Sequence, residues 1–190
     1  GTGIWPADMA RLFPESLVLG LDVDTELFSK NLPENCLLRA GNVLTGLPLP
    51  DAVFSFTHQR FLVLAIPDDH WPKVVQELVR VTLPGGWIEM VETDARVQAG
   101  GPATTQIFAW IDLVRQERGI MGESVRHLGE LLSQEGITDV ETQSIPLKVG
   151  AWGGRAGHMM EQDLLRLPMN PPALRDRAGE IGRASCRERV

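Results

Sequence analysis

The residues best suited to chemistry lie near the start of the chain, where two glycines precede an apolar run that ends in an aspartate. Gly1 and Gly3 flank Thr2, and Asp22 follows the run LVLGL. Glycine lets the main chain turn tightly and come close to a ligand, and a carboxylate at the tip of a strand can accept both hydroxyls of a ribose. This pattern predicts a binding site for a cofactor that contains adenosine.

The same turn favours a cofactor without phosphate groups. A dinucleotide-binding turn needs a small residue three places after its second glycine and uses helix amides to hold a pyrophosphate. That place holds Pro6, which has no amide hydrogen, and the bulky Trp5 precedes it. S-adenosylmethionine carries adenine and ribose but no phosphate, so it fits the turn better than a nicotinamide dinucleotide does.

Short apolar runs alternate with helical patterns in the first half of the chain. The expected helices span residues 5–13 and 69–82, and the expected strands span residues 17–21, 36–39, 52–57 and 87–91. Pro84, Gly85 and Gly86 are expected to form a turn between the second helix and the last strand. The alternation predicts crossover connections, and therefore an α/β fold with a mostly parallel sheet.

The second half of the chain has a looser pattern. The elements expected there are helices at residues 103–118, 123–135 and 151–167 and a late strand at residues 140–147. Residues 180–190 can be encoded by a nucleotide sequence that looks like a common sequencing adapter read in frame. We therefore interpret this segment as a non-native tail and expect one domain over residues 1–179.

Composition indicates a globular domain with an acidic surface. The 190 residues are 43% apolar and 23% charged, with a formal net charge of −7. The negative charge argues against nucleic acid as a partner, because a phosphate backbone attracts basic surfaces. No apolar run approaches the length of a membrane span, so no membrane partner is expected. Cys36 lies alone on an apolar stretch outside the tail, which favours a small packed residue and the reducing cytoplasm.

Four segments resemble the class I S-adenosylmethionine-dependent methyltransferases. They are GTG, LVLGLDVD, LRAGNVLTGLPLPDAVFSFTHQRFL and HWPKVVQELVRVTLPGGWIEMVE. They look like the end of the glycine-rich motif, the second strand, the adenine contact with the fourth strand, and the helix and turn before the fifth strand. The resemblance is strong over residues 1–94 and loose over residues 103–167. It implies a Rossmann-like three-layer α/β/α sandwich in a chain truncated at both ends, with the first strand missing.

The resemblance also implies how the cofactor, S-adenosylmethionine, is held. The implied cofactor contacts are Gly1, Gly3, Asp22, Val23, Asn42, Val43 and His58. Asp22 takes the place of the acidic residue that binds the ribose. Asn42 replaces the usual aspartate at the adenine contact and can still accept a hydrogen bond from the adenine amino group. Ser55 replaces a frequent acidic residue of the fourth strand, so the cofactor's amino group would rely more on main-chain carbonyls near His58.

His58 is the candidate for direct catalysis. It follows the strand expected at residues 52–57, at the carboxyl edge where open α/β sheets bind ligands. An imidazole there could act as a base or contact the acceptor, or it could be a histidine that only packs at the strand end. No spacing typical of a metal site is visible in the sequence.

The resemblance implies direct transfer of the activated methyl group of S-adenosylmethionine to a small-molecule acceptor. Asn42 and Ser55 leave open a second hypothesis, a methyltransferase-like domain that binds a partner without catalysis. A third hypothesis is an NAD(P)-binding oxidoreductase, which Pro6 disfavours. The sequence leaves the acceptor and the oligomeric state open.

Overall fold

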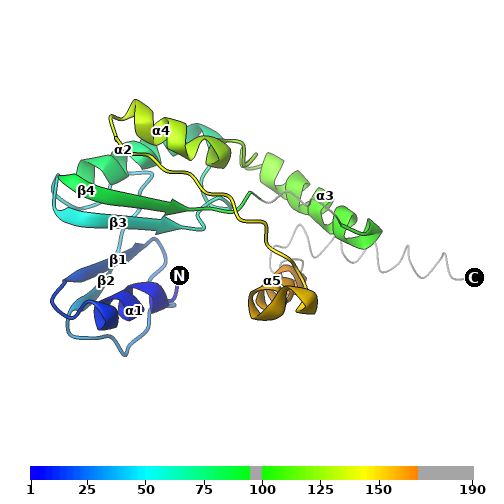
Figure 1. Ribbon diagram of the computed structural model, residues 1–190, viewed down its shortest axis with the longest axis horizontal. Coiled ribbons are helices and arrows are strands. Elements are labelled where there is room, and N and C mark those ends of the chain that lie inside the picture. Colours follow the sequence, from blue (N-terminus) through cyan, green and yellow to red (C-terminus); the bar gives the residue numbers. More distant parts are fainter. Residues whose placement is uncertain (95–99, 167–190) are drawn as a thin grey trace, which may run out of the picture. The chain divides into compact units, whose positions relative to one another are not determined.

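The computed structural model describes residues 1–94 and 100–166 (Figure 1). The described residues form two compact units. Unit 1 holds residues 1–59 and 72–90, and unit 2 holds residues 60–71 and the described residues from 91 onward. The expected domain over residues 1–179 extends past the described residues, so its boundary stays a prediction, as does the tail at residues 180–190.

The first part of unit 1 is a helix packed on a pair of parallel strands. Helix α1 spans Ile4–Leu12, strand β1 spans Val18–Asp22, and strand β2 spans Cys36–Ala40. Val18 lies opposite Cys36 and Asp22 lies opposite Ala40, so both strands end at the same edge. The core between helix and strands is built from the small side chains of Ala7, Ala10 and Cys36, which allow a close approach.

The second part of unit 1 contains the other strand pair and an amphipathic helix. Strand β3 spans Phe54–Arg60, helix α2 spans Trp71–Val81, and strand β4 spans Thr82–Val91. In Figure 1, β3 and β4 run side by side in the same direction. The buried side chains of α2 recur at helical spacing, as the sequence predicted: Trp71, Val74, Val75, Leu78 and Val81.

The α/β class with parallel strands is confirmed. The strands form two sheets of two strands each, in the orders β1-β2 and β3-β4, compatible with a Rossmann-like arrangement. The boundaries of the four expected strands and of the first two helices shift by a few residues, and each of these elements is present.

The turn expected at Pro84–Gly86 is wrong, because these residues lie inside β4. Val53 donates its amide to the carbonyl of Val81, and Phe61 donates to the carbonyl of Val91. Between these two hydrogen bonds β4 contains two more residues than β3, as in a β-bulge. Gly85 has a φ of 79°, a conformation that glycine adopts without strain. The residues that suggested a turn therefore accommodate the extra residues of β4 within the strand.

An arginine holds the turn before β3 to helix α2. Arg80 donates hydrogen bonds to the carbonyl oxygens of Leu47 and Leu49 and to the carboxylates of Glu77 and Asp51. The amide of Leu47 also donates to Glu77. Hydrogen bonds from Arg80 lower the pKa of Glu77 despite partial burial of the carboxylate, so this pair is ionised at neutral pH.

The described part of unit 2 is mainly helical. Its elements are the 3-10 turn η1 at Asp68–His70, helix α3 at Pro102–Gln116, the 3-10 turn η2 at Ser124–His127, helix α4 at Leu128–Gln134, the 3-10 turn η3 at Ala151–Gly153 and helix α5 at Gly154–Arg166. The three helices expected after Asp94 are therefore present, although the end expected at residue 167 falls outside the described residues.

The late strand expected at residues 140–147 is wrong. These residues run without strand pairing, and the side chains of Ile145 and Leu147 are 67% and 55% exposed. A strand is held by hydrogen bonds to a neighbouring strand, and neither of the sheets among the described residues includes this segment. An apolar run alone therefore did not decide its structure.

Candidate functional site

The glycine-rich turn lies directly before helix α1. Gly3 is the N-cap of this helix and has a φ of 76°, in the left-handed region. A Cβ at this position would lie 2.4 Å and 3.3 Å from the two terminal methyl groups of Leu38. The backbone conformation and the close packing both require glycine here, and they leave the main chain of the turn free of a side chain.

Asp22 ends β1 with its carboxylate at the carboxyl edge of the strand pair. Its side chain is 29% exposed and accepts hydrogen bonds from the amino group of Gly1 and from the amide of Asp24. The amides of Asp24 and Val23 donate hydrogen bonds to the Asp22 carboxylate and favour its ionised form. Asp22 is thus an ionised acceptor beside the glycine turn, and Val23 next to it is 69% exposed.

Asn42 lies close to the same edge, in a turn that follows β2. The amide of Gly41 donates to the main-chain carbonyl of Asp22 over 2.9 Å, which fixes the start of this turn beside the aspartate. The side-chain oxygen of Asn42 accepts the amide of Leu44 over 2.9 Å, and Val43 is half-buried. A carbonyl oxygen has two lone pairs, so Asn42 keeps capacity for one more donor.

His58 lies near the end of β3 and is held on two sides. Its ring stacks on Trp5 of α1, with centroids 3.8 Å apart and planes 11° apart. Its Nδ1 lies 2.7 Å from Oε2 of Glu89 on β4. The side chain is only 8% exposed, and Nε2 is buried without a hydrogen-bond partner among the described residues. Because Trp5 is two residues from Gly3, the first turn of α1 links His58 to the glycine turn.

The structure thus places Gly1, Gly3, Asp22 and Asn42 at one edge of a strand pair. His58 joins this group through Trp5, a contact that the sequence analysis did not foresee. Glu89 was also missed as a partner of His58. Neither contact has a local signal, because each joins elements that are distant in sequence.

Comparison with known proteins was made over the whole chain, and no family model matches it. N-methyltransferase verN of Clonostachys rogersoniana is 29% identical over 154 residues, which cover 78% of this chain and 53% of that protein. Methyltransferase str2 of Strobilurus tenacellus is 31% identical over 94 residues, or 50% of this chain and 33% of that protein. The chain is thus similar to proteins named methyltransferases.

A third relative has a different kind of name. Secondary metabolism regulator laeA of Aspergillus fumigatus is 26% identical over 159 residues, which cover 80% of this chain and 42% of that protein. The chain therefore spans about half or less of the length of these three relatives. Similarity at this level supports the family and leaves the acceptor open.

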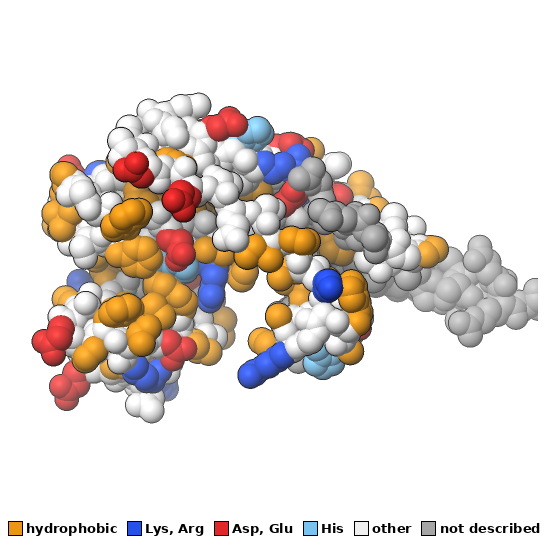
Figure 2. All heavy atoms as spheres, in the orientation of Figure 1, with side chains coloured by type: hydrophobic (Ala, Val, Ile, Leu, Met, Phe, Trp, Pro, Cys, Tyr) orange, Lys and Arg blue, Asp and Glu red, His pale blue; other side chains and the backbone are white. Residues whose placement is uncertain are grey.

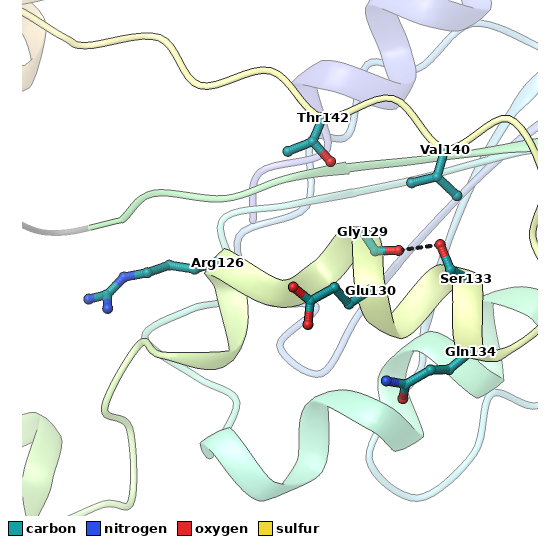
Figure 3. A pocket seen from close by; sticks show the side chains of 7 residues that line it. All are labelled: Arg126, Gly129, Glu130, Ser133, Gln134, Val140 and Thr142. Atoms are coloured by element: carbon teal, nitrogen blue, oxygen red, sulfur yellow. Dashed lines mark hydrogen bonds between the residues drawn. The ribbon is translucent and has the colours of Figure 1, made fainter.

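A surface hollow lies in unit 2. It has a volume of about 480 Å³ and is lined by η2, α4 and the segment after α4: Arg126, Gly129, Glu130, Ser133, Gln134, Val140 and Thr142 (Figure 3). The Ser133 hydroxyl donates to the carbonyl of Gly129 over 2.9 Å, and Arg126 pairs with Asp94 and Glu123. None of the expected site residues lines the hollow, so we do not assign the cofactor to it.

Two further properties bear on the kind of site. Within residues 1–94 and 100–166, no cluster of three or more His, Cys, Asp or Glu side chains has the proximity to hold a metal ion. No helix in the same residues is both long and apolar enough to cross a membrane. Hydrophobic side chains are nevertheless common at the surface (Figure 2), with Leu17 72% exposed and Ile4 62% exposed.

Proposed function

We propose that this chain is part of a methyltransferase domain that uses S-adenosylmethionine to methylate a small-molecule acceptor. The observation that supports this most is the ionised Asp22 carboxylate at the carboxyl edge of β1, beside the left-handed Gly3 turn. A carboxylate in this place can accept the two ribose hydroxyls of an adenosyl group. Kinship with methyltransferases supplies the reaction class.

The residues present fit this cofactor better than a dinucleotide. Helix α1 begins at Ile4, so Pro6 is its third residue and removes one of the first-turn amides that a pyrophosphate would need. Gly3 has a left-handed backbone and packs against Leu38, so the turn requires glycine at this position. The negatively charged Asp22 would also favour the sulfonium cation over an anionic phosphate.

Each site residue has a role in this proposal. When bound, S-adenosylmethionine supplies an activated methyl group. Gly1 and Gly3 let the main chain approach it, Asp22 accepts its ribose hydroxyls, and Asn42 accepts the adenine amino group. Val23 and Val43 flank these two polar contacts. His58 contacts the acceptor from the end of β3.

The cellular setting is part of the same proposal. The net charge of −7 supports a small-molecule acceptor over nucleic acid. Cys36 is a buried free thiol, and its burial raises its pKa, which supports a packing role compatible with the cytoplasm. The oligomeric state is not part of the proposal.

A second candidate is a methyltransferase-like domain that binds a partner without catalysis. Asn42 and Ser55 occupy places where the resembled family has acidic residues, and one relative is named a regulator. Binding of S-adenosylmethionine without release of S-adenosylhomocysteine would favour this candidate. Binding of NAD(P) alone would instead favour an oxidoreductase.

Calorimetric titration with S-adenosylmethionine tests the proposal through Asp22→Ala. We expect the affinity to fall by about 1–3 kcal/mol, because ribose hydroxyls lose a charged acceptor. Asp8→Ala is the matched control, since Asp8 is an exposed aspartate of α1 that pairs with Arg11 of the same helix. Unchanged affinity of a folded Asp22→Ala variant would remove Asp22 from the site.

A further inference from the structure

A buried histidine and an exposed glutamate form a pair on the neighbouring strands β3 and β4. Nδ1 of His58 lies 2.7 Å from Oε2 of Glu89, and the two side chains are 8% and 56% exposed. An ionised carboxylate can only accept hydrogen bonds, so the hydrogen in this contact is carried by Nδ1. In the neutral imidazole the lone pair then lies on Nε2.

The second ring nitrogen of His58, Nε2, is placed to accept a hydrogen bond. Nε2 is buried and has no hydrogen-bond partner among the described residues. A buried acceptor without a donor is unfavourable, and such groups are commonly explained by a ligand or by a catalytic role. The ring of Trp5 covers one face of the imidazole at 3.8 Å and restricts its rotation. The imidazole is therefore oriented by a contact at its edge and by another on its face.

We propose that Glu89 is a positioning residue that keeps His58 in the Nδ1–H tautomer, so that Nε2 accepts a proton from the methyl acceptor. This inference rests on the proposed methyl transfer and narrows its substrate class. The acceptor would carry a hydroxyl or an N–H group that must lose a proton. A thioether or a tertiary amine needs no base and would gain nothing from this pair.

The proton and electron balance of the step is complete. A lone pair of the acceptor oxygen or nitrogen forms the new bond to the methyl carbon while the carbon–sulfur bond of S-adenosylmethionine breaks, leaving its electron pair on sulfur. The acceptor's proton passes to Nε2 of His58. The resulting imidazolium is stabilised by Glu89, whose carboxylate contacts the opposite nitrogen.

Nuclear magnetic resonance reports the tautomer directly. In long-range ¹H–¹⁵N spectra of the neutral ring we expect Nε2 of His58 to be unprotonated, with the signal assigned by its loss in His58→Gln. Glu89→Ala should mix the two tautomers, whereas Glu89→Gln should keep the Nδ1–H form because its amide oxygen still accepts. Glu15→Gln, which removes the charge of an exposed glutamate in the same unit, should leave the spectrum unchanged. A hydrogen on Nε2 in the unaltered protein would overturn the inference.

Turnover with phenols and secondary amines as probe acceptors tests the catalytic consequence. We expect Glu89→Ala to slow the release of S-adenosylhomocysteine by at least about tenfold at unchanged KM for the cofactor, and Glu89→Gln to retain more of the rate. Equal rates for Glu89→Ala and the unaltered protein would overturn the inference while leaving methyl transfer intact. Cofactor binding without turnover on any probe would overturn the base role and favour the partner-binding candidate. Loss of cofactor binding would instead refute the proposed function.

Discussion

The sharpest stability prediction concerns Asp68, whose carboxylate organises a loop more than fifty residues away. Its Oδ1 accepts the amides of Met121 and Gly122 over 2.8 and 2.9 Å, and its Oδ2 accepts those of Glu123 and Ser124 over 2.9 and 3.1 Å. The Ser124 hydroxyl also donates to the main-chain carbonyl of Asp68. One half-buried side chain therefore satisfies four consecutive amides of the turn between α3 and η2.

Asp68→Ala leaves these four amides without their acceptor. A hydrogen bond to a charged group stabilises a protein by about 1.5–3 kcal/mol, but four bonds to one carboxylate do not add, and exposed amides regain water. We therefore expect a loss of about 2–4 kcal/mol in the free energy of unfolding. Asp68→Asn should lose less, because its single remaining oxygen can still accept.

The pH dependence has a definite sign. Partial burial raises the pKa of Asp68, but the hydrogen bonds from Gly122, Ser124, Met121 and Glu123 outweigh it, so the folded-state pKa lies below the ordinary value. The stabilisation is then fully present above the unfolded-state pKa of about 4 and is lost as the pH falls through the folded-state pKa. The difference between the unaltered protein and Asp68→Asn should shrink below about pH 4.

Urea unfolding at pH 7 and at pH 3 measures both effects, with Asp69→Ala as the matched control. Asp69 is the adjacent residue, its side chain is 80% exposed, and its contact is with His70. We expect the control to change the unfolding free energy by less than about 0.5 kcal/mol. A loss for Asp68→Ala no larger than that of the control would refute the reasoning from the four hydrogen bonds.

Two further predictions use the same unfolding assay. Glu77→Ala should lower the free energy of unfolding by about 1–3 kcal/mol, because it removes an acceptor of hydrogen bonds from Arg80 and from the amide of Leu47. The pKa of Glu77 is lowered in the folded protein, so this loss should shrink as the pH falls and the carboxylate becomes protonated. An equal loss at pH 7 and pH 3 would contradict this. Gly3→Ala should cost about 1–2 kcal/mol through its left-handed backbone, whereas Gly101→Ala, with a φ of −69° and no atom within 4 Å of an added Cβ, should be tolerated; equal effects of the two variants would show that the Gly3 backbone relaxes freely.

The sequence predicts those elements that carry their own periodic signal. Helix α2 is one, since five buried side chains at helical spacing leave no other regular structure that buries them together. Strand β1 is another, because an apolar run that ends at Asp22 is long enough for a strand and too short for a helix. The α/β class follows from how these elements alternate. No pairing partner had to be known for any of these inferences.

The errors occur where structure depends on a neighbour. Residues 140–147 have the composition of a strand but pair with no described strand, and a strand forms only through such pairing. Gly85 illustrates a different limit. A glycine with a positive φ suits a turn or a bulge equally well, and only the offset between β3 and β4 decides for the bulge.

The dependence on neighbouring elements also explains why the sequence indicated some residues of the candidate site and not the contacts of His58. Gly3 and Asp22 can be recognised from local sequence. Glycine lets the main chain come close to a ligand, and an aspartate that ends an apolar run lies at the tip of a strand. His58 was recognisable only as a polar residue near a strand end, which fits catalysis and packing equally well. In the proposed mechanism its tautomer depends on Glu89, and the contact with Glu89 requires the register of two strands separated by helix α2. Trp5 adds a constraint from a third element, so the orientation of His58 is a property of the folded unit and of no single segment.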